Sequence, residues 1–434
     1  MTSPPTVQPP FLVALNLTKR CNLGCAHCYL DAKILKKGST DELTTDEVKG
    51  VLSDIASLSL ECMVVLTGGE PLLRQDIETL AQHAAGLGLM VVVGSNGILL
   101  TPERARKLKT AGVAGIGISV DSLDPAKHDA FRGRKGAWIK TMAAIDACRE
   151  AELAHQIHFS VTDDTADEIA DMVAFAREAG ALVLNVFFLV CTGRGERYTD
   201  ISAENYEHVL RRVAEAAYTE KRLMVRAKCA PHFKRMAVEL DPAWPITTAH
   251  GYEAGGCLAG THYARITPEG EVTACPYIET SVGSVRDASF SQLWRDAPMF
   301  QALRAPELKG RCGICEYRKL CGGCRARPLA RDGDLMAEDF LCSYQPSGAK
   351  VLEPASPVAD ELDWTPEAEA RIKRVPGFVR RMVRRRAEEF VCAEGRSTVT
   401  ADDLATLAKR RFGDAGPPSF AANGIDRSPP GGTG

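Results

Sequence analysis

The stretch Cys21-Asn-Leu-Gly-Cys25-Ala-His-Cys28 follows a short apolar run, Phe11 to Leu17, that is typical of a buried strand. Three cysteines therefore leave the end of one strand within eight residues. Four thiolates close a structural zinc or iron–sulphur site, whereas three thiolates on a [4Fe-4S] cubane leave one iron open to an outside ligand. The spacing alone also fits a zinc loop, or a site whose fourth ligand comes from elsewhere in the chain.

A second motif, Thr67-Gly68-Gly69-Glu70-Pro71, ends the next apolar run at residues 62 to 66. Two glycines let backbone groups come close to a ligand, and a carboxylate accepts hydrogen bonds from an ammonium group. Alone, the motif also fits a tight strand-to-helix turn. Together, C-x3-C-x2-C after the first strand and GGEP after the second resemble the radical S-adenosylmethionine (SAM) enzymes.

This resemblance implies an enzyme with a catalytic [4Fe-4S] cluster on Cys21, Cys25 and Cys28, whose free iron chelates the amine and carboxylate of SAM. It also implies that the GGE turn holds the SAM amine, and that the ends of the third and fourth strands supply further hydroxyl and amide groups. The residues expected to bind SAM are Gly68, Gly69, Glu70, Ser95, Asn96, Ser119 and Arg132. For Arg132, an arginine on a solvated loop is the competing interpretation.

The bulk composition favours a soluble protein. The chain has 434 residues, 45% of them hydrophobic, enough for one large core and one or two smaller units. A net charge of -3 gives no reason to expect nucleic acid. Fifteen cysteines cannot all pair, and their C-x2-C spacings suit metal thiolates in a reducing compartment. With no signal peptide and no apolar run near the ~18 residues of a membrane span, we expect a cytoplasmic protein.

Strand-like and helix-like segments alternate through the first half of the chain. Apolar runs lie at 11–17, 62–66, 89–94, 113–120, 155–162 and 182–190. Helix-like segments lie near 44–58, 75–87, 102–111, 137–152, 165–179 and 203–217. Such βα units predict an α/β fold with a parallel sheet, either open or curled into a partial barrel. The family resemblance favours an incomplete (βα)6 barrel with its site at the carboxyl ends of the strands.

The second half of the chain is rich in cysteine. C-x2-C-x5-C-x2-C at residues 312 to 324 indicates a metal site, for which zinc ribbons are the main competitor and disulfides a weaker one. Behind a radical SAM barrel, the seven cysteines from Cys257 to Cys342 resemble a SPASM domain, which carries two auxiliary [4Fe-4S] clusters. Only two glycines separate the last pair, where many SPASM domains have three residues.

The resemblance assigns these thiols to two clusters. The outer cluster would take Cys312, Cys315, Cys321 and Cys342. The inner cluster would take Cys257, Cys275 and Cys324, with Cys229 or an open site as the fourth ligand. The remaining thiols, expected to be buried rather than ligating, are Cys62, Cys148, Cys191 and Cys392.

Four stretches, at 187–194, 227–233, 256–260 and 312–327, resemble the haem synthases of the siroheme-derived pathway. This implies oxidative decarboxylation of two propionates of iron-coproporphyrin III to vinyl groups, giving protohaem. The alternatives are another tetrapyrrole side-chain reaction (of haem d1, siroheme or chlorophyll precursors), peptide modification, and a non-catalytic iron–sulphur scaffold.

Two candidate substrate residues are Arg194 and His232. Further candidate partners for the substrate carboxylates are Arg132, Lys228, Arg325 and Arg327. We also expect an electron donor such as flavodoxin or ferredoxin, and a monomer.

The segment after Trp364 resembles the small C-terminal domain of light-independent protochlorophyllide reductase subunits. Its run of arginines among apolar residues fits either an anion-binding surface or the solvated face of an amphipathic helix. The expected parts are a flexible N-terminus at 1–10, a radical SAM partial barrel at 11–222, a SPASM domain at 223–347, a linker at 348–361, a small helical domain at 362–413 and a disordered tail at 414–434.

Overall fold

The computed structural model describes residues 7–34, 38–190, 192–197, 201–248, 256–354, 362–375 and 377–412. The chain forms two compact units, Met1–Ala355 and Ser356–Gly434. The tail predicted at 414–434, residues 1–6 of the expected flexible N-terminus and residues 355–361 of the expected linker lie outside the described residues.

One sheet organises the first unit. Its strands are β1 (Leu12–Asn16), β2 (Met63–Thr67), β3 (Met90–Ser95), β4 (Val113–Ser119), β5 (His155–Val161), β6 (Val183–Phe188), β7 (Met224–Lys228), β8 (Tyr263–Ile266), β9 (Glu271–Cys275) and β10 (Ile278–Ser284). The strand order is β10-β9-β8-β1-β2-β3-β4-β5-β6-β7, so among the described residues β10 and β7 are unpaired edges. Strands β1 to β7 pair in parallel, β8 is parallel to β1, and β9 and β10 are antiparallel. The predicted α/β class with a parallel sheet is confirmed through the first seven strands.

Helices connect the parallel strands. In the first unit they are α1 (Thr45–Leu58), η1 (Pro71–Leu73), α2 (Ile77–Gly86), α3 (Pro102–Thr110), α4 (Pro125–Arg132), α5 (Ala137–Glu150), η2 (Asp163–Glu168), α6 (Ile169–Glu178), η3 (Gly193–Arg197), α7 (Ala203–Thr219), α8 (Phe233–Leu240), α9 (Pro245–Thr248), α10 (Phe290–Asp296), α11 (Pro298–Arg304), α12 (Gly310–Ile314) and α13 (Ala326–Asp332). Thr44 caps α1 in a capping box with Glu47, and Thr101 caps α3 ahead of Pro102. Both helices lie within the helix-like segments predicted near 44–58 and 102–111.

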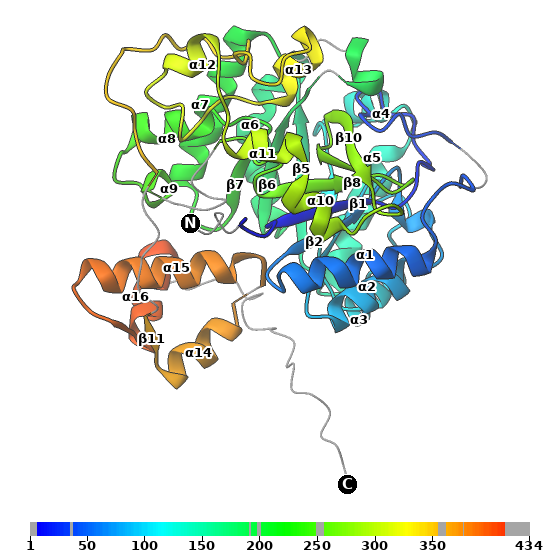
Figure 1. The fold of residues 1–434 in the computed structure, drawn as a ribbon. Helices are drawn as coiled ribbons and strands as arrows, with labels where there is room; N and C mark the ends of the chain where they lie inside the picture. Colours follow the sequence, from blue (N-terminus) through cyan, green and yellow to red (C-terminus); the bar gives the residue numbers. More distant parts are fainter. Residues whose placement is uncertain are drawn as a thin grey trace. The chain divides into compact units, whose positions relative to one another are not determined.

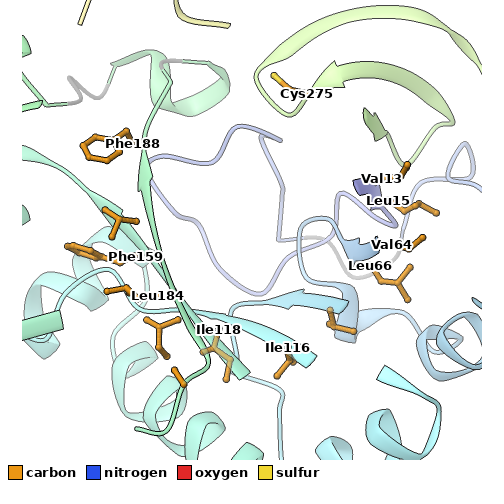
Figure 2. Packing of buried hydrophobic residues seen from close by; sticks show 14 of the residues in the cluster. Val13, Leu15, Val64, Leu66, Ile116, Ile118, Phe159, Leu184, Phe188 and Cys275 are labelled. Carbon is orange, nitrogen blue, oxygen red and sulfur yellow. The ribbon is translucent and has the colours of Figure 1, made fainter. Parts of the chain in front are cut away.

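The core lies between the outer face of the sheet and the helices. Alternate strand residues such as Val13, Leu15, Ile116 and Ile118 are buried there, and Figure 2 shows these side chains pointing away from the inside of the curved sheet. Helices α1 to α3 lie together along one side of the sheet (Figure 1). Since the outer face takes the apolar side chains, the inner face is left for polar residues and for the loops at the strand ends.

Two features extend the predicted six βα units. Strand β7 adds a seventh parallel strand, and the cysteine-rich region contributes β8, β9 and β10 at the opposite edge of the same sheet. The cysteine-rich second half of the chain is therefore attached near both edges of one continuous sheet, after β7 and at β9.

The second unit has a core of its own. It contains α14 (Pro366–Lys373), α15 (Gly377–Ala393), α16 (Ala401–Phe412) and a parallel pair of short strands, β11 (Asp363–Trp364) and β12 (Thr398–Val399). Ala368, Ile372, Ala387 and Val391 are buried between them. The expectation of a helical domain thus needs one addition, the two-stranded pair. In the described parts of the chain, no helix combines the length and the apolar character that crossing a membrane requires.

Candidate iron–sulphur and SAM site

The first three cysteines lie on the loop that follows β1, at the carboxyl end of the parallel strands. The loop closes on itself, since Cys21 N donates to Lys33 O at 2.9 Å. Cys21, Cys25 and Cys28 pack in one cluster with Leu23 and Leu30, among other residues. Burial raises the pKa of the Cys21 thiol to about 12, and the neighbouring thiols of Cys25 and Cys28 add to the rise. The three sulphur atoms are thus close enough to interact.

The GGE turn holds the start of this loop. Gly69 N donates to Thr18 O at 2.7 Å, and Glu70 N donates to Arg20 O at 2.8 Å. A Cβ atom on Gly69 would lie 2.2 Å from Arg20 O, far inside van der Waals contact. The backbone of the turn therefore approaches the cysteine loop as closely as only glycine permits.

The Glu70 carboxylate binds three groups of the protein. Its side chain is fully buried and accepts hydrogen bonds from Ser95 Oγ at 2.9 Å, Asn96 N at 2.9 Å and Leu72 N at 3.0 Å. Asn96 Nδ2 in turn donates to Cys21 Sγ at 3.8 Å. Four of the predicted SAM residues, Gly69, Glu70, Ser95 and Asn96, are thus linked to one another and to the first cysteine. Ser119, another of the predicted set, is half-buried at the end of β4.

Arg132 is the last residue of helix α4, and its side chain is buried. It forms an ion pair with Asp121, and its Nη1 donates to Cys25 Sγ at 3.7 Å. Although burial opposes it, the Arg132 charge holds the pKa of Asp121 below its ordinary value. The alternative of an arginine on a solvated loop is therefore wrong.

The end of α4 contacts the cysteine loop through its backbone as well. Gly133 has a φ of 66° and caps the helix. A Cβ atom there would lie 2.7 Å from Gly24 O, so glycine is required both by the backbone angle and by the close approach. Ala26 N donates to Phe131 O at 3.2 Å. Two separate elements, the GGE turn and α4, therefore fix the loop that carries the three thiols.

The two candidate substrate residues have partners within the protein. Arg194 Nε donates to Cys25 O at 3.1 Å, and its Nη1 donates to Ala32 O at 2.6 Å, so this side chain clamps the cysteine loop. His232 is buried, with its Nδ1 at 2.7 Å from the Tyr206 hydroxyl. Burial lowers the pKa of His232 to about 4, so the imidazole is neutral at pH 7. Both side chains therefore already have hydrogen-bond partners within the protein.

The thiols assigned to the inner cluster lie close together. The Cys257 and Cys324 thiols share a hydrogen bond, and the charges of Cys324 and Cys229 both act on Cys275. Cys229 has a φ of 57°, unusual for a residue other than glycine, and its thiol hydrogen-bonds with Tyr277. The structure thus brings Cys229 into the same group as the other three thiols.

The thiols assigned to the outer cluster line one cavity. Its walls include Cys312, Cys315, Cys321 and Cys342, together with His232, Arg235 and Tyr344. Burial raises the pKa of Cys321, and the neighbouring Cys342 and Cys312 thiols add to the rise. Four thiols around one cavity are the donor set that a [4Fe-4S] cluster takes.

The arrangement of donors fits cubanes at all three places. Each group contains three or four thiols whose charges act on one another, and at least one thiol of each group is buried. Among the residues that the structure describes, no three Cys, His, Asp or Glu side chains converge on a point where one metal ion would sit. A cubane instead receives each thiolate at a different iron. Cys62 and Cys148 are buried in the barrel core, Cys392 is half-buried, and Cys191 lies outside the described residues.

Sequence reasoning did not single out two buried carboxylates of these sites. Asp121 pairs with Arg132, and Asp339 accepts hydrogen bonds from Cys324 N at 2.8 Å and from Arg327 Nη1 at 3.0 Å. Asp121 was recognisable as a polar residue at the carboxyl end of a predicted strand. The sequence signal for Asp339 was its position between Cys324 and Cys342, two predicted cluster ligands.

Comparison with known proteins agrees with this geometry. The family model of the radical SAM superfamily matches residues 15–176, that of the SPASM iron–sulphur cluster-binding domain matches residues 257–325, and that of the proto-chlorophyllide reductase 57 kD subunit matches residues 364–407. The solved structure of SuiB from Streptococcus suis bound to SAM superposes with a TM-score of 0.60 at 17% identity, covering 78% of each chain. That likeness confirms the fold.

Two curated relatives carry the same name. The AdoMet-dependent heme synthase of Methanosarcina barkeri is 40% identical over 343 residues, which covers 78% of this chain and 97% of the relative. The AdoMet-dependent heme synthase of Nitratidesulfovibrio vulgaris is 37% identical, covering 77% of this chain and 92% of the relative. The chain therefore belongs to the radical SAM enzymes with a SPASM domain, in the family of the AdoMet-dependent heme synthases.

Proposed function

We propose that this enzyme converts two propionates of iron-coproporphyrin III to vinyl groups, giving protohaem. The observation that carries the proposal is the 40% identity with an AdoMet-dependent heme synthase over nearly the full length of that relative. Each propionate, R-CH2-CH2-CO2−, would lose one hydrogen atom from its β-carbon and then CO2, giving R-CH=CH2. One surplus electron leaves the substrate for each propionate converted, and the auxiliary clusters are its proposed acceptor.

We propose that Cys21, Cys25 and Cys28 hold the cluster that binds SAM. When bound, this cluster and SAM supply the 5'-deoxyadenosyl radical that removes the hydrogen atom. The protein's part is to fix the loop, through the GGE turn, the end of α4 and Arg194. Glu70 serves as a positioning residue, because its carboxylate orients Ser95 and Asn96 beside Cys21. A rigid site of this kind keeps a reactive species next to one C–H bond.

The ligand and domain assignments that the sequence predicts are part of this proposal. The inner cluster takes Cys229, Cys257, Cys275 and Cys324, and the outer cluster takes Cys312, Cys315, Cys321 and Cys342. The mutual proximity of the thiols within each group supports these sets. We further propose a monomeric, cytoplasmic enzyme that receives its electrons from a flavodoxin or a ferredoxin. The thiol-rich composition, which suits a reducing compartment, supports the location.

The test is anaerobic reconstitution followed by mass spectrometry of the products. With dithionite, SAM and iron-coproporphyrin III, we expect protohaem, 5'-deoxyadenosine and about 12 irons per chain, from three clusters of four. Siroheme derivatives and chlorophyll precursors are incubated in parallel. Conversion of one of these instead, or 5'-deoxyadenosine without any change to the iron-coproporphyrin, would contradict the proposed substrate. A chain that binds iron but cleaves no SAM would be a non-catalytic iron–sulphur scaffold.

Single cysteine variants test the ligand assignment. Cys21→Ala should lose SAM cleavage and keep the auxiliary clusters, about eight irons. Cys392→Ala, in the second unit, is the matched control and should keep every cluster. SAM cleavage in Cys21→Ala would exclude this cysteine as a ligand.

A further inference from the structure

The substrate proposed above carries four carboxylates, so its site needs cations that are not already neutralised by the protein. Of five cationic residues that the sequence offers as carboxylate partners, four are engaged. Arg132 pairs with Asp121, and Arg194 clamps the cysteine loop. Arg325 donates to Ala337 O at 2.9 Å, and Arg327 pairs with Asp339. The side chain of the fifth, Lys228, has neither a hydrogen bond nor an ion pair among the described residues.

Lys228 has a second cation beside it. Arg226 lies two positions earlier on β7, and the electrostatic influence of its charge reaches Lys228. Residues i and i+2 of a strand point to the same face, about 6.6 Å apart along it. The Arg226 side chain also lacks a hydrogen bond or ion pair within the described part of the chain. Both side chains are half-buried.

These two side chains face the inside of the curved sheet. Val225, which lies between Met224 and Arg226 on β7, is buried in the outer core together with Leu184 and Val186. The register pairs Arg226 with Asn185 and Lys228 with Phe187, so the inner face continues onto β6. Alternation along β7 therefore places Arg226 and Lys228 on the face opposite the helices.

The inner face connects this pair to the first thiol group. His158 on β5 is paired in register with Asn185, and its ring packs against the Phe187 ring at 5.3 Å. The charges of Lys228 and of Arg132 both act on His158. Since Arg132 donates to Cys25 Sγ, Lys228 and the predicted SAM cluster border the same space.

Two neighbouring cations that are partly withdrawn from water are unfavourable in an unliganded protein. Among the described residues, the Cys229 thiolate is the opposite charge that acts on Lys228, and no carboxylate pairs with either cation. A bound anion would remove this penalty. Carboxylate is the anion that the proposed chemistry brings to this face of the sheet.

We propose that Arg226 and Lys228 bind a propionate carboxylate of the tetrapyrrole, inside the barrel and next to the loop of Cys21, Cys25 and Cys28. This inference rests on the proposed function. It gives β7 a direct role in presenting the substrate, because a propionate held there fixes the orientation of the macrocycle relative to the thiol loop.

The test is a binding titration with the anaerobically reconstituted full-length chain. The probes are iron-coproporphyrin III and its tetramethyl ester, which keeps the ring and iron but has no free carboxylate. Lys228→Met should weaken binding of the acid by about 10- to 100-fold and leave binding of the ester unchanged. Lys228→Arg should restore most of the affinity for the acid. Lys140→Met, at an exposed lysine of α5, removes the same charge and should bind both probes as the wild type does.

The possible results test the carboxylate site at Arg226 and Lys228 separately from the proposed function. If wild type binds the acid but Lys228→Met and an Arg226→Met/Lys228→Met variant bind it equally well, the carboxylate site is refuted and the proposed function stands. If the variants lose affinity for SAM instead, measured by equilibrium dialysis, the carboxylate belongs to SAM and the inference is refuted. If wild type binds neither probe, the proposed function and the inference both fail. Iron content and circular dichroism of each variant show that it has folded with its clusters.

Discussion

Replacement of Gly69 by alanine tests whether the GGE turn acts through its close approach to the cysteine loop. An added Cβ would lie 2.2 Å from Arg20 O and 2.7 Å from the carbonyl carbon of Arg20. Real contacts of this kind are at least about 3.0 Å, so the loop or the turn has to move by roughly 1 Å. Both neighbours are backbone, which cannot swing away as a side chain can.

The expected loss has two parts. Forcing a group into a filled site costs about 1–3 kcal/mol. The shift also lengthens the bonds from Gly69 N to Thr18 O and from Glu70 N to Arg20 O, now 2.7 and 2.8 Å, each worth about 1 kcal/mol. We expect the free energy of unfolding to fall by about 2–4 kcal/mol, less than the full sum because relaxation is shared. The measurement is anaerobic denaturant unfolding followed by circular dichroism.

The same displacement should reach the thiols. Because Arg20 precedes Cys21, moving its carbonyl disturbs the first cluster and leaves the auxiliary ones in place. The iron content of Gly69→Ala should fall from about 12 towards about eight per chain. Gly50→Ala is the matched control, since its Cβ meets nothing within 4 Å in the exposed part of helix α1. That variant should be stabilised by about 0.5–1 kcal/mol. Wild-type stability and iron content in Gly69→Ala would refute the close-contact argument.

Three further predictions follow from buried groups and from the division of the chain. Arg132→Met should lower the free energy of unfolding by about 3–5 kcal/mol, because it leaves the Asp121 carboxylate buried without its cation. Adding Asp121→Asn to this variant should recover most of the loss. If the losses of the two substitutions add instead, the ion pair is contradicted. Burial lowers the pKa of His155 from 6.5 to about 4. Between these pH values the unfolded chain takes up a proton that the folded chain does not. The free energy of unfolding should therefore fall as the pH drops from 6.5 towards 4. His155→Gln should show a smaller fall over that pH range in denaturant titrations, and an unchanged slope would argue against a neutral buried imidazole. A chain ending at residue 354 should keep the unfolding midpoint of the first unit, because the second unit has a separate core; a lower midpoint would show that the two cores depend on each other.

The sequence predicted most of the barrel because its first six strands are apolar runs. It did not predict β7, since Met224-Val-Arg-Ala-Lys228 has charged residues on its inner face and no apolar run. Helix α4 was also missed, although Asp124 followed by Pro125 is a readable helix start. Polar inner faces and short helices weaken the periodic pattern on which such predictions depend.

At the candidate site, motif spacing predicted which residues gather but not what each side chain contacts. The three groups of thiols follow from cysteine spacing together with the family resemblance. In contrast, Arg194 and Cys25 are separated by 169 residues, and no local pattern reports that the arginine holds the loop carbonyl. Asp121 and Arg132 are closer in sequence, but their pairing depends on the turn at the end of β4 and on α4. Such contacts depend on packing, which a single sequence does not encode locally.

The inner thiol group joins parts of the chain from opposite edges of the sheet. Cys229 directly follows β7 at one edge of the open sheet, whereas Cys275 ends β9 near the other edge. The Cys229 thiol nevertheless hydrogen-bonds with Tyr277, in the turn between β9 and β10, so the two edges meet at this point. A cluster bound there would cross-link the ends of the curved sheet where hydrogen bonds between strands do not. The SPASM region would then complete the wall of the barrel and hold Arg226 and Lys228, on the adjoining strand, facing the inside of that wall.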